Sequence, residues 1–349
     1  MNNLITRMKH HLRSGLDLFA QIFGLLRQSE KKMHNGLTIL MYHRVLPLKE
    51  CIDYPLSSLV VPLDVFELQM KWLFSHHTVL PVIEAVERLE KGEKLEKSLV
   101  SVTFDDGYLD NYEHAAPIMD KLNLRGTFFI TTGFVANKEP QWFDRAALIW
   151  SKFTYENKTE LLLQIQEEMK GLSTDFTITD GLSTWMEKLK TIKPSIRMKI
   201  IERAESINPS LLNFNNYQPM TVDQIRALHK KNHEIASHTV SHQIVSQLDE
   251  SSLKTELDES SKQLESWIGS PIKGFCYPNG NYTKTVEKTV LETGYEYACT
   301  VEEGTNFPGS NKTRLLRIPI TMRRTMNGFS HDQLGFRAEI SRLRARYRK

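Results

Sequence analysis

The stretch LVSVTFDDGY, residues 99–108, joins a run of apolar and β-branched residues to two adjacent carboxylates. A run without polar alternation is typical of a strand that is covered on both faces of a parallel sheet. Asp105 and Asp106 repel each other at the end of this run, and unpaired charges are rarely buried. The pair therefore belongs either to a plain solvated turn or to a functional site.

Seven further apolar runs alternate with amphipathic helical segments along the chain. They cover residues 37–43, 77–82, 126–132, 233–238, 272–278, 295–301 and 315–320. Continuously apolar strands separated by helices predict a parallel sheet. About eight such units favour an α/β fold in which the sheet closes into a (β/α) barrel. An open doubly wound sheet is the alternative.

The alternation stops between residues 140 and 220, where the sequence is charged, helical in pattern and without a convincing strand. We interpret this stretch as a helical insertion in a βα loop, with Trp142 and Trp150 in a small core of its own. The chain is then divided into an N-terminal amphipathic helix, a barrel domain that contains the insertion, and a basic C-terminal tail, at residues 1–35, 36–325 and 326–349.

Both ends of the chain are basic. Between residues 4 and 27, apolar side chains recur at helical spacing on one face, namely Leu12, Leu16, Phe19, Ile22, Phe23 and Leu26. Such a helix packs on the barrel, lies on an anionic membrane surface or binds a partner protein. Asp17 interrupts the apolar stretch and no small-residue cleavage site follows, so a secretory signal is not predicted. The C-terminal tail predicts a solvated helix, with a membrane or polyanion contact as the alternative.

The composition is that of an ordinary soluble globular protein, with 349 residues, 40% hydrophobic and 25% charged. The net charge of +3 does not require a nucleic-acid partner, and we expect none. Cys51, Cys276 and Cys299 form neither a disulfide framework nor a CxxC pattern, which fits a reducing compartment. We expect a cytoplasmic protein, with a peripheral position on the inner membrane face or export as alternatives. The oligomeric state is left open.

A second polar cluster lies in EIASHTVSHQ, residues 234–243. His238 and His242 are four residues apart, so that on a helical turn both imidazoles share a face and converge on one metal ion. An H-x-x-x-H pattern alone is a weak signal. It gains weight because these histidines and the paired aspartates each follow a predicted strand, and parallel α/β folds build their sites at the carboxyl ends of strands.

Two histidines and one carboxylate form an open set of ligands that suits zinc-type hydrolysis or non-haem iron chemistry. The additional carboxylate favours hydrolysis. If Asp106 binds the metal, Asp105 is free to accept a proton from water as a general base. A bound cation would also relieve the repulsion between the two aspartates.

Two motifs of the sequence resemble those of a known family. TFDDGY at 103–108 and SHTVSH at 237–242 closely resemble the first and second motifs of the polysaccharide deacetylases, carbohydrate esterase family 4 or the NodB homology domain. LMYHRV at 40–45 and FCYPNGNY at 275–282 resemble further landmarks. The resemblance covers residues 36–325 and implies a distorted (β/α) barrel that removes acetyl groups from sugars with one divalent metal.

The resemblance implies that Asp105 is the general base, and that the metal ligands are Asp106, His238 and His242. Zinc is the favoured ion, with cobalt or nickel as alternatives. The sequence departs from the family at two places. Cys276 occupies the position of the arginine that orients the base, and no late Leu-x-His motif supplies a histidine to protonate the leaving amine. Arg317 and His43 are available substitutes as catalytic residues.

Four further residues are candidates for substrate binding. Tyr42 and Tyr108 are expected to line a sugar groove by stacking, with plain packing of the rings as the alternative. Pro278 shapes a turn in which the backbone N–H of Asn279 is expected to face the oxyanion of the reaction, with a plain turn as the alternative.

These features predict a metal-dependent hydrolase that removes acetyl groups from N-acetylated sugars of a surface polysaccharide or a lipid-linked glycan precursor. The alternative from another class is a non-catalytic glycan-binding or scaffolding protein that keeps the barrel. The missing arginine and late histidine leave this alternative open.

Overall fold

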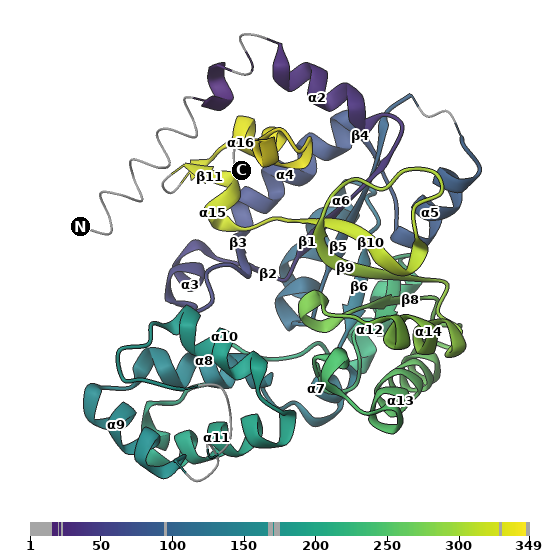
Figure 1. The fold of residues 1–349 in the computed structure, drawn as a ribbon. Helices are drawn as coiled ribbons and strands as arrows, with labels where there is room; N and C mark the ends of the chain where they lie inside the picture. Colours follow the sequence, from purple (N-terminus) through teal and green to yellow (C-terminus); the bar gives the residue numbers. More distant parts are fainter. Residues whose placement is uncertain are drawn as a thin grey trace.

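The protein, as a computed structural model, is built around a closed ring of parallel strands (Figure 1). The structure describes residues 16–19, 21, 24–93, 96–166, 170, 175–327 and 330–346. Seven strands follow one another in the order β1-β10-β9-β8-β7-β6-β5, and pairing of β1 with β5 closes the ring. The strands are β1 Leu37–Tyr42, β5 Ser98–Phe104, β6 Thr127–Ile130, β7 Glu234–Ser237, β8 Gly274–Cys276, β9 Tyr297–Glu303 and β10 Leu315–Pro319.

The predicted barrel is thus confirmed and the open sheet is excluded. All eight apolar runs contain strands, although only seven belong to the ring. The eighth, β4 (His77–Val79), pairs with the first residues of β5, whereas β6 pairs with its last two. Two short pairs lie outside the barrel: β2 (Arg44–Leu46) with β3 (Val60–Pro62), and β11 (Met326–Asn327) with β12 (Ser330–His331).

The strands read as continuous apolar runs because both of their faces are covered. Every residue of β5 is buried. Successive side chains of a strand point to opposite faces. Accordingly, Val102 and Phe104 pack in the cluster that includes Phe66 of helix α4, whereas Leu99 packs with Ile39 and other residues in a second cluster.

Helices cover the outside of the ring, namely α4 Leu63–His76, α5 Val82–Glu90, α6 Ala116–Lys121, α12 Val222–Lys230, α13 Glu250–Ile268 and α14 Lys284–Glu292. The longest is α13. The Asp249 carboxylate accepts the N–H of Ser252 at its start, and Gly269 ends it with φ of 71°. This helix lies against β7, the strand that precedes the two histidines.

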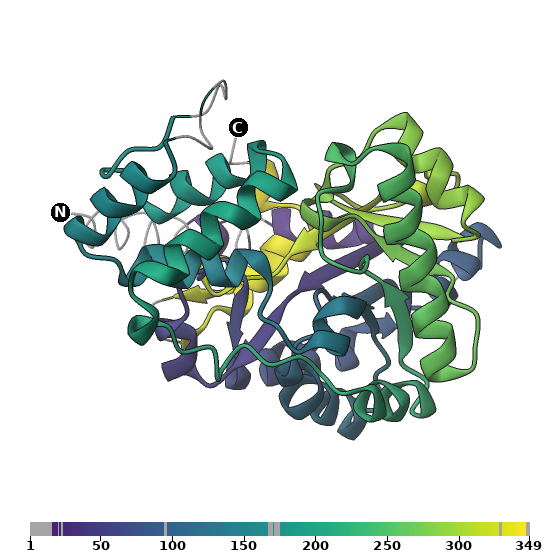
Figure 2. The same cartoon turned by 90° about the horizontal axis from the view of Figure 1, so that it is seen from below.

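The stretch after β6 is helical, as expected from its sequence. Its helices are α7 Thr132–Asn137, α8 Trp142–Lys152, α9 Tyr155–Gln164, α10 Leu182–Thr191 and α11 Pro194–Ile207. Figure 2 shows α8–α11, in teal, as a bundle on one side of the barrel. Trp150 stacks on Trp185 with ring centroids 4.3 Å apart, in a core made largely of residues of this bundle.

The prediction of a solvated C-terminal tail is wrong. Helix α16 (Gln333–Ile340) lies beside α2 (Leu25–Met33), as Figure 1 shows, and Leu26 packs with Ala338 and Leu343. Several of the basic residues that the structure describes in this segment are in charge pairs. Arg344 is buried with Asp17 and Asp332 as partners. These cations are paired with carboxylates of the chain itself, which leaves them less free for a membrane or polyanion.

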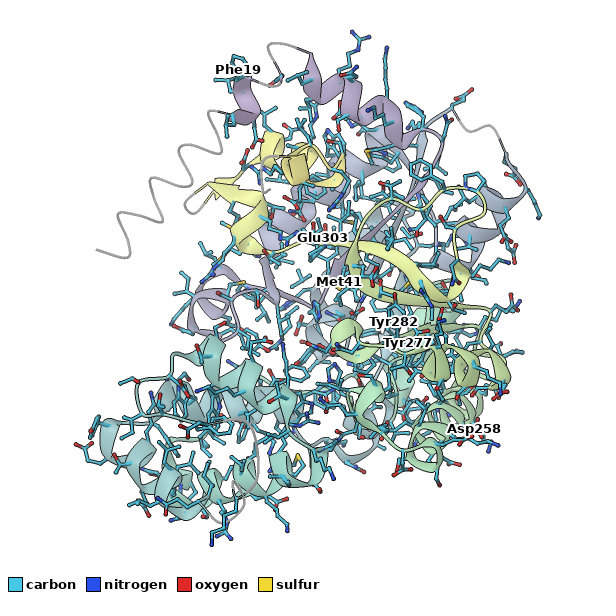
Figure 3. All side chains as sticks on the ribbon, viewed as in Figure 1. Phe19, Met41, Asp258, Tyr277, Tyr282 and Glu303 are labelled. Carbon is cyan, nitrogen blue, oxygen red and sulfur yellow. The ribbon has the colours of Figure 1, made fainter. Side chains whose placement is uncertain are left out.

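The N-terminal segment is not one continuous helix. Gly24 has φ of 71°, which interrupts the helical path before α2 begins. Leu26 faces the protein, whereas Leu16 is 40% and Phe19 52% exposed. Figure 3 shows Phe19 far from Tyr277 at the barrel. Leu12, Ile22 and Phe23 lie outside the described residues. Among the helices described, none has the length and apolar character needed to cross a membrane. Membrane contact stays a prediction.

Candidate active site

The polar residues singled out in the sequence meet at the carboxyl ends of the barrel strands. Asp105 and Asp106 follow β5, and His238 follows β7. Asp106 and Gly107 have φ of 77° and 90°, which turns the chain sharply away from the strand. Positive φ is rare for a residue with a side chain and is common at functional sites. Both carboxylates are also buried, so the pair does not belong to a plain solvated turn.

Three buried side chains are arranged so that they could hold one cation. Asp106 Oδ1 lies 3.2 Å from His242 Nε2 and 3.5 Å from His238 Nε2. The three ligand atoms lie within 4.8 Å of one another. Both carboxylate oxygens of Asp106 lack a hydrogen bond of good geometry among the described residues. Buried acceptors without donors, facing imidazole nitrogens, are what a divalent cation requires, so these residues fit the metal that the family motifs imply.

The protonation states also fit. His238 Nδ1 lies 2.8 Å from the carbonyl oxygen of Cys276, which can only accept, so Nδ1 carries the proton and the lone pair of Nε2 is free. Burial lowers the pKa of His242 and favours the neutral imidazole that a metal needs.

The second aspartate has a different environment. Arg317 Nη1 and Nη2 donate to Asp105 Oδ1 and Oδ2 at 2.7 and 2.8 Å, and Arg317 Nε donates to the carbonyl of Thr300 at 2.8 Å. Both partners of this bidentate pair are buried. Burial alone would raise the pKa of Asp105, but the Arg317 guanidinium holds it below its ordinary value. The structure thus brings Arg317 against Asp105, as expected.

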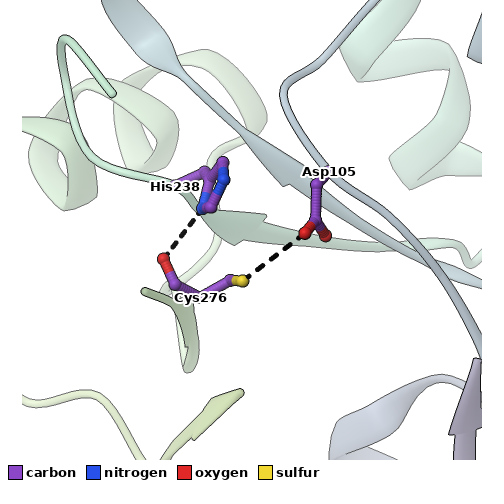
Figure 4. Close-up of side chains that lie close together, drawn as sticks. All are labelled: Asp105, His238 and Cys276. Carbon is purple, nitrogen blue, oxygen red and sulfur yellow. Dashed lines mark hydrogen bonds between the residues drawn. The ribbon is translucent and has the colours of Figure 1, made fainter. Parts of the chain in front are cut away.

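The thiol of Cys276 contacts both members of the pair formed by Asp105 and Arg317. Its Sγ lies 3.0 Å from Arg317 Nη2 and 3.7 Å from Asp105 Oδ2, the contact drawn in Figure 4. Asp105, His238 and Cys276 also have ligand atoms within 4.8 Å of one another. This second set is a poor cation site, because the guanidinium of Arg317 already binds two of its members. Burial also raises the pKa of the Cys276 thiol and keeps it protonated.

His43 lies at the edge of the same group. Its Nε2 is 3.9 Å from Asp105 Oδ2, and its side chain is 19% exposed, against 3% for Asp105. The carbonyl of His43 accepts a hydrogen bond from Asn111 Nδ2 at 2.7 Å, which fixes the backbone at the end of β1. His43 is therefore an imidazole that solvent reaches beside the buried carboxylate.

The predicted stacking roles of Tyr42 and Tyr108 are wrong in this structure. Both side chains are fully buried. Tyr42 Oη donates to Gln69 Oε1 at 2.9 Å. Tyr108 Oη donates to Asp144 Oδ2, and burial raises the pKa of that carboxyl to about 7. Neither ring presents a face to solvent, because both rings fill space between the strand ends and the surrounding helices.

Pro278 and Asn279 form a turn directly after β8, on the same side of the barrel as His238. Pro278 is buried and Asn279 is exposed, with φ of 57°. Gly280 follows with φ of 75°, and a Cβ there would meet the side chain of Val301 at 2.3 Å, so the turn requires glycine. The oxyanion role of Asn279 stays a prediction.

The start of the insertion also contacts the site, which the sequence interpretation missed. Trp142 Nε1 donates to the carbonyl of His242 at 3.1 Å. The ring of Phe143 lies 4.8 Å from the imidazole of His242. Trp142 therefore does more than pack in a core within the insertion. Its partner lies a hundred residues away in the chain, and nothing in the spacing or composition of either segment signals the contact.

Comparison with known proteins identifies the family. A model of the polysaccharide deacetylase family matches residues 92–298, more than half of the chain. YxkH of Bacillus subtilis, which is named only provisionally as a polysaccharide deacetylase, is 36% identical over 103 residues. The poly-β-1,6-N-acetyl-D-glucosamine N-deacetylase of Staphylococcus aureus is 31% identical over 121 residues. These matches span 29% and 31% of this chain, and 34% and 40% of the relatives' own length.

Solved structures show the same fold. The Streptococcus pyogenes deacetylase PplD, solved in complex with acetate, superposes with a TM-score of 0.56 at 19% identity. The superposition covers 84% of this chain and 96% of PplD. Together with the match of the family model and the barrel described above, this shows that the chain belongs to the polysaccharide deacetylase family.

Proposed function

We propose that this protein is a metal-dependent hydrolase that removes acetyl groups from N-acetylated sugars of a surface polysaccharide or a lipid-linked glycan precursor. The observation that carries the proposal is the difference between the surroundings of two adjacent carboxylates. Asp105 pairs with Arg317, whereas Asp106 faces two imidazoles. The name of the S. aureus relative supports poly-N-acetylglucosamine as the first substrate to test.

The ligands in this proposal are Asp106, His238 and His242, with zinc favoured and cobalt or nickel as alternatives. A divalent cation bound there supplies a Lewis acid for the acetyl carbonyl and lowers the pKa of water. Asp105 accepts the proton of the attacking water, because its carboxylate is ionised and lies beside the ligand set without belonging to it. Arg317 orients Asp105 and keeps it ionised.

The leaving amine needs a proton as the carbon–nitrogen bond breaks, and His43 is our candidate donor. It lies beside Asp105 and is the more exposed of the two side chains. A histidine donates a proton readily near neutral pH. In this proposal His43 replaces the late histidine that the sequence lacks.

The test of the proposed function is acetate release from β-1,6-linked N-acetylglucosamine oligomers. We expect release that a chelator abolishes and that added zinc, cobalt or nickel restores. A parallel panel of other acetylated glycans and lipid-linked sugars identifies the substrate. Oligomer binding without chelator-sensitive release from any member of the panel would contradict the proposal and favour the glycan-binding alternative.

Replacing Arg317 with methionine is expected to lower the rate at neutral pH by about 10²-fold, because the base loses its orientation. Asp105 must be ionised to act, and without the guanidinium its burial raises the pKa. The acid limb of the pH–rate profile therefore moves to higher pH. A pH series of kcat/KM measures both effects.

Arg314→Met is the matched control, since Arg314 pairs with Glu287 and is 38% exposed. It should leave the pH profile unchanged. Arg317→Met also leaves a carboxylate buried without its partner, which costs about 3–5 kcal/mol of stability. Urea unfolding shows whether the variant is still folded under the assay conditions. A folded Arg317→Met variant with the rate and acid limb of the wild type would refute the role of Arg317.

A further inference from the structure

The short loop between the two histidines is held by a carboxylate that belongs to neither sequence motif. Glu256, in α13, points toward the loop residues Val240 and Ser241. Its Oε2 accepts the backbone N–H groups of Val240 and Ser241 at 2.8 and 2.9 Å. Its Oε1 accepts the hydroxyl of Ser241. One carboxylate therefore satisfies three donors of a three-residue connection.

The loop needs such support because its backbone is unusual. Thr239 and His242 have φ of 68° and 53°, a region that residues with side chains rarely adopt. Within the loop, the N–H of His242 donates to Thr239 Oγ1 at 2.9 Å. The carbonyls of Thr239 and Val240 accept N–H groups from the start of α7 at 3.1 and 2.8 Å.

The hydrogen bonds to α7 show that the carbonyls and the N–H groups of the loop point in opposite directions. The carbonyls face α7, so the N–H groups of Val240 and Ser241 face away from that helix and require another acceptor. A carboxylate has acceptor sites for all three donors. An amide could keep the same contacts by turning its oxygen to the two N–H groups and its NH₂ to the Ser241 hydroxyl, which can also accept, so a test of these hydrogen bonds has to remove the whole acceptor group. The length and charge of Glu256 both suit this position.

We propose that Glu256 is a positioning residue for the metal ligands: it fixes the backbone of residues 240 and 241 and thereby sets the orientation of His242 relative to His238. The inference rests on the proposed function, since it concerns the same metal site. Glu256 touches neither the ligand atoms nor the reacting groups in this scheme. Partners that orient metal ligands typically change metal affinity by about 10–100-fold when they are removed.

The chain offers a matched control on the same helix. Glu259 lies one turn further along α13, is exposed, and has Lys262 as its partner at 3.8 Å. Both glutamates line one surface hollow beside Val240. Glu259→Ala removes the same charge from this hollow and leaves the three hydrogen bonds to the loop intact. It therefore separates a long-range effect of charge from the effect of the hydrogen bonds.

The experiment compares wild type, Glu256→Ala and Glu259→Ala by zinc competition against a chromophoric chelator and by the visible spectrum of the cobalt-loaded proteins. We expect Glu256→Ala to weaken zinc binding by about 10–100-fold and to change the cobalt spectrum, while Glu259→Ala matches wild type. Urea unfolding of the metal-free proteins records any purely structural effect. Ser241→Ala, which removes only the hydroxyl bond, provides a milder variant if Glu256→Ala does not fold, and it should weaken zinc binding less.

Wild-type zinc affinity and cobalt spectrum in folded Glu256→Ala, or in Ser241→Ala if that is the variant that folds, would overturn the inference while the metal site stands. Equal weakening by Glu259→Ala would assign the effect to charge and would overturn it as well. If the wild-type protein itself binds neither ion, the proposed function fails together with the inference. The failures are thus distinguishable.

Discussion

Asp105→Asn is expected to slow acetate release by about 10²–10⁴-fold, the contribution of a positioned general base, while the protein keeps its metal. Asparagine preserves the shape of the side chain but cannot accept the proton of water. Because Asp105 pairs with Arg317 and does not belong to the ligand set formed with Asp106, the loss should fall on kcat and not on metal content. Steady-state kinetics and elemental analysis of the same preparation measure the two quantities.

The control for this variant has to break a buried ion pair without touching the reaction. Asp110 serves this purpose, since it is buried and accepts from Arg44 Nε at 2.9 Å. Asp110→Asn should lower stability to a similar extent and leave most of the rate. If Asp105→Asn lost the metal and Asp106→Asn kept it, the roles of base and ligand would be reversed.

The double variant His238→Ala, His242→Ala is expected to lose both the metal and all measurable acetate release. It leaves Asp106 as the single remaining member of the ligand set, and one carboxylate does not hold a divalent cation against dialysis. Elemental analysis after dialysis, with circular dichroism as a check on the fold, measures the outcome.

His233→Ala is the matched control for this loss. His233 is buried just before β7, at the end of the strand opposite His238, with Asp120 3.0 Å away. Its replacement removes a buried imidazole from the opposite end of the same strand, and the protein should keep its metal. Stoichiometric metal in the double variant would contradict the assignment of the site.

The sequence by itself determined the barrel strands and the convergence of the two motifs. The eight strands can be recognised without knowing which strands pair with one another, because a strand covered on both faces has an apolar residue at nearly every position. Asp106 and His238 could be brought together for a similar reason. Each directly follows such a run, and parallel strands place their carboxyl ends at one edge of the sheet.

Only the tertiary structure decided which further side chains contact the residues at the carboxyl ends of the strands. Arg317 lies within a strand whose sequence looks like ordinary core, and its pairing with Asp105 depends on how the ring closes. The periodicity of a segment shows that one face is buried but not what buries it. For this reason the sequence predicts a groove position for Tyr42, which is buried, and a solvated C-terminal segment, which packs on α2.

The contacts that support the candidate metal site could not be predicted from the sequence either. Trp142 approaches His242 across a hundred residues, and Glu256 reaches the loop from the side of a helix. A tryptophan in an apolar stretch and a glutamate in a charged helix each have an adequate local explanation. Their contacts with His242 and with the loop that precedes it follow from the packing of α8 and α13 against the barrel, and long-range packing leaves no periodic signal in the chain.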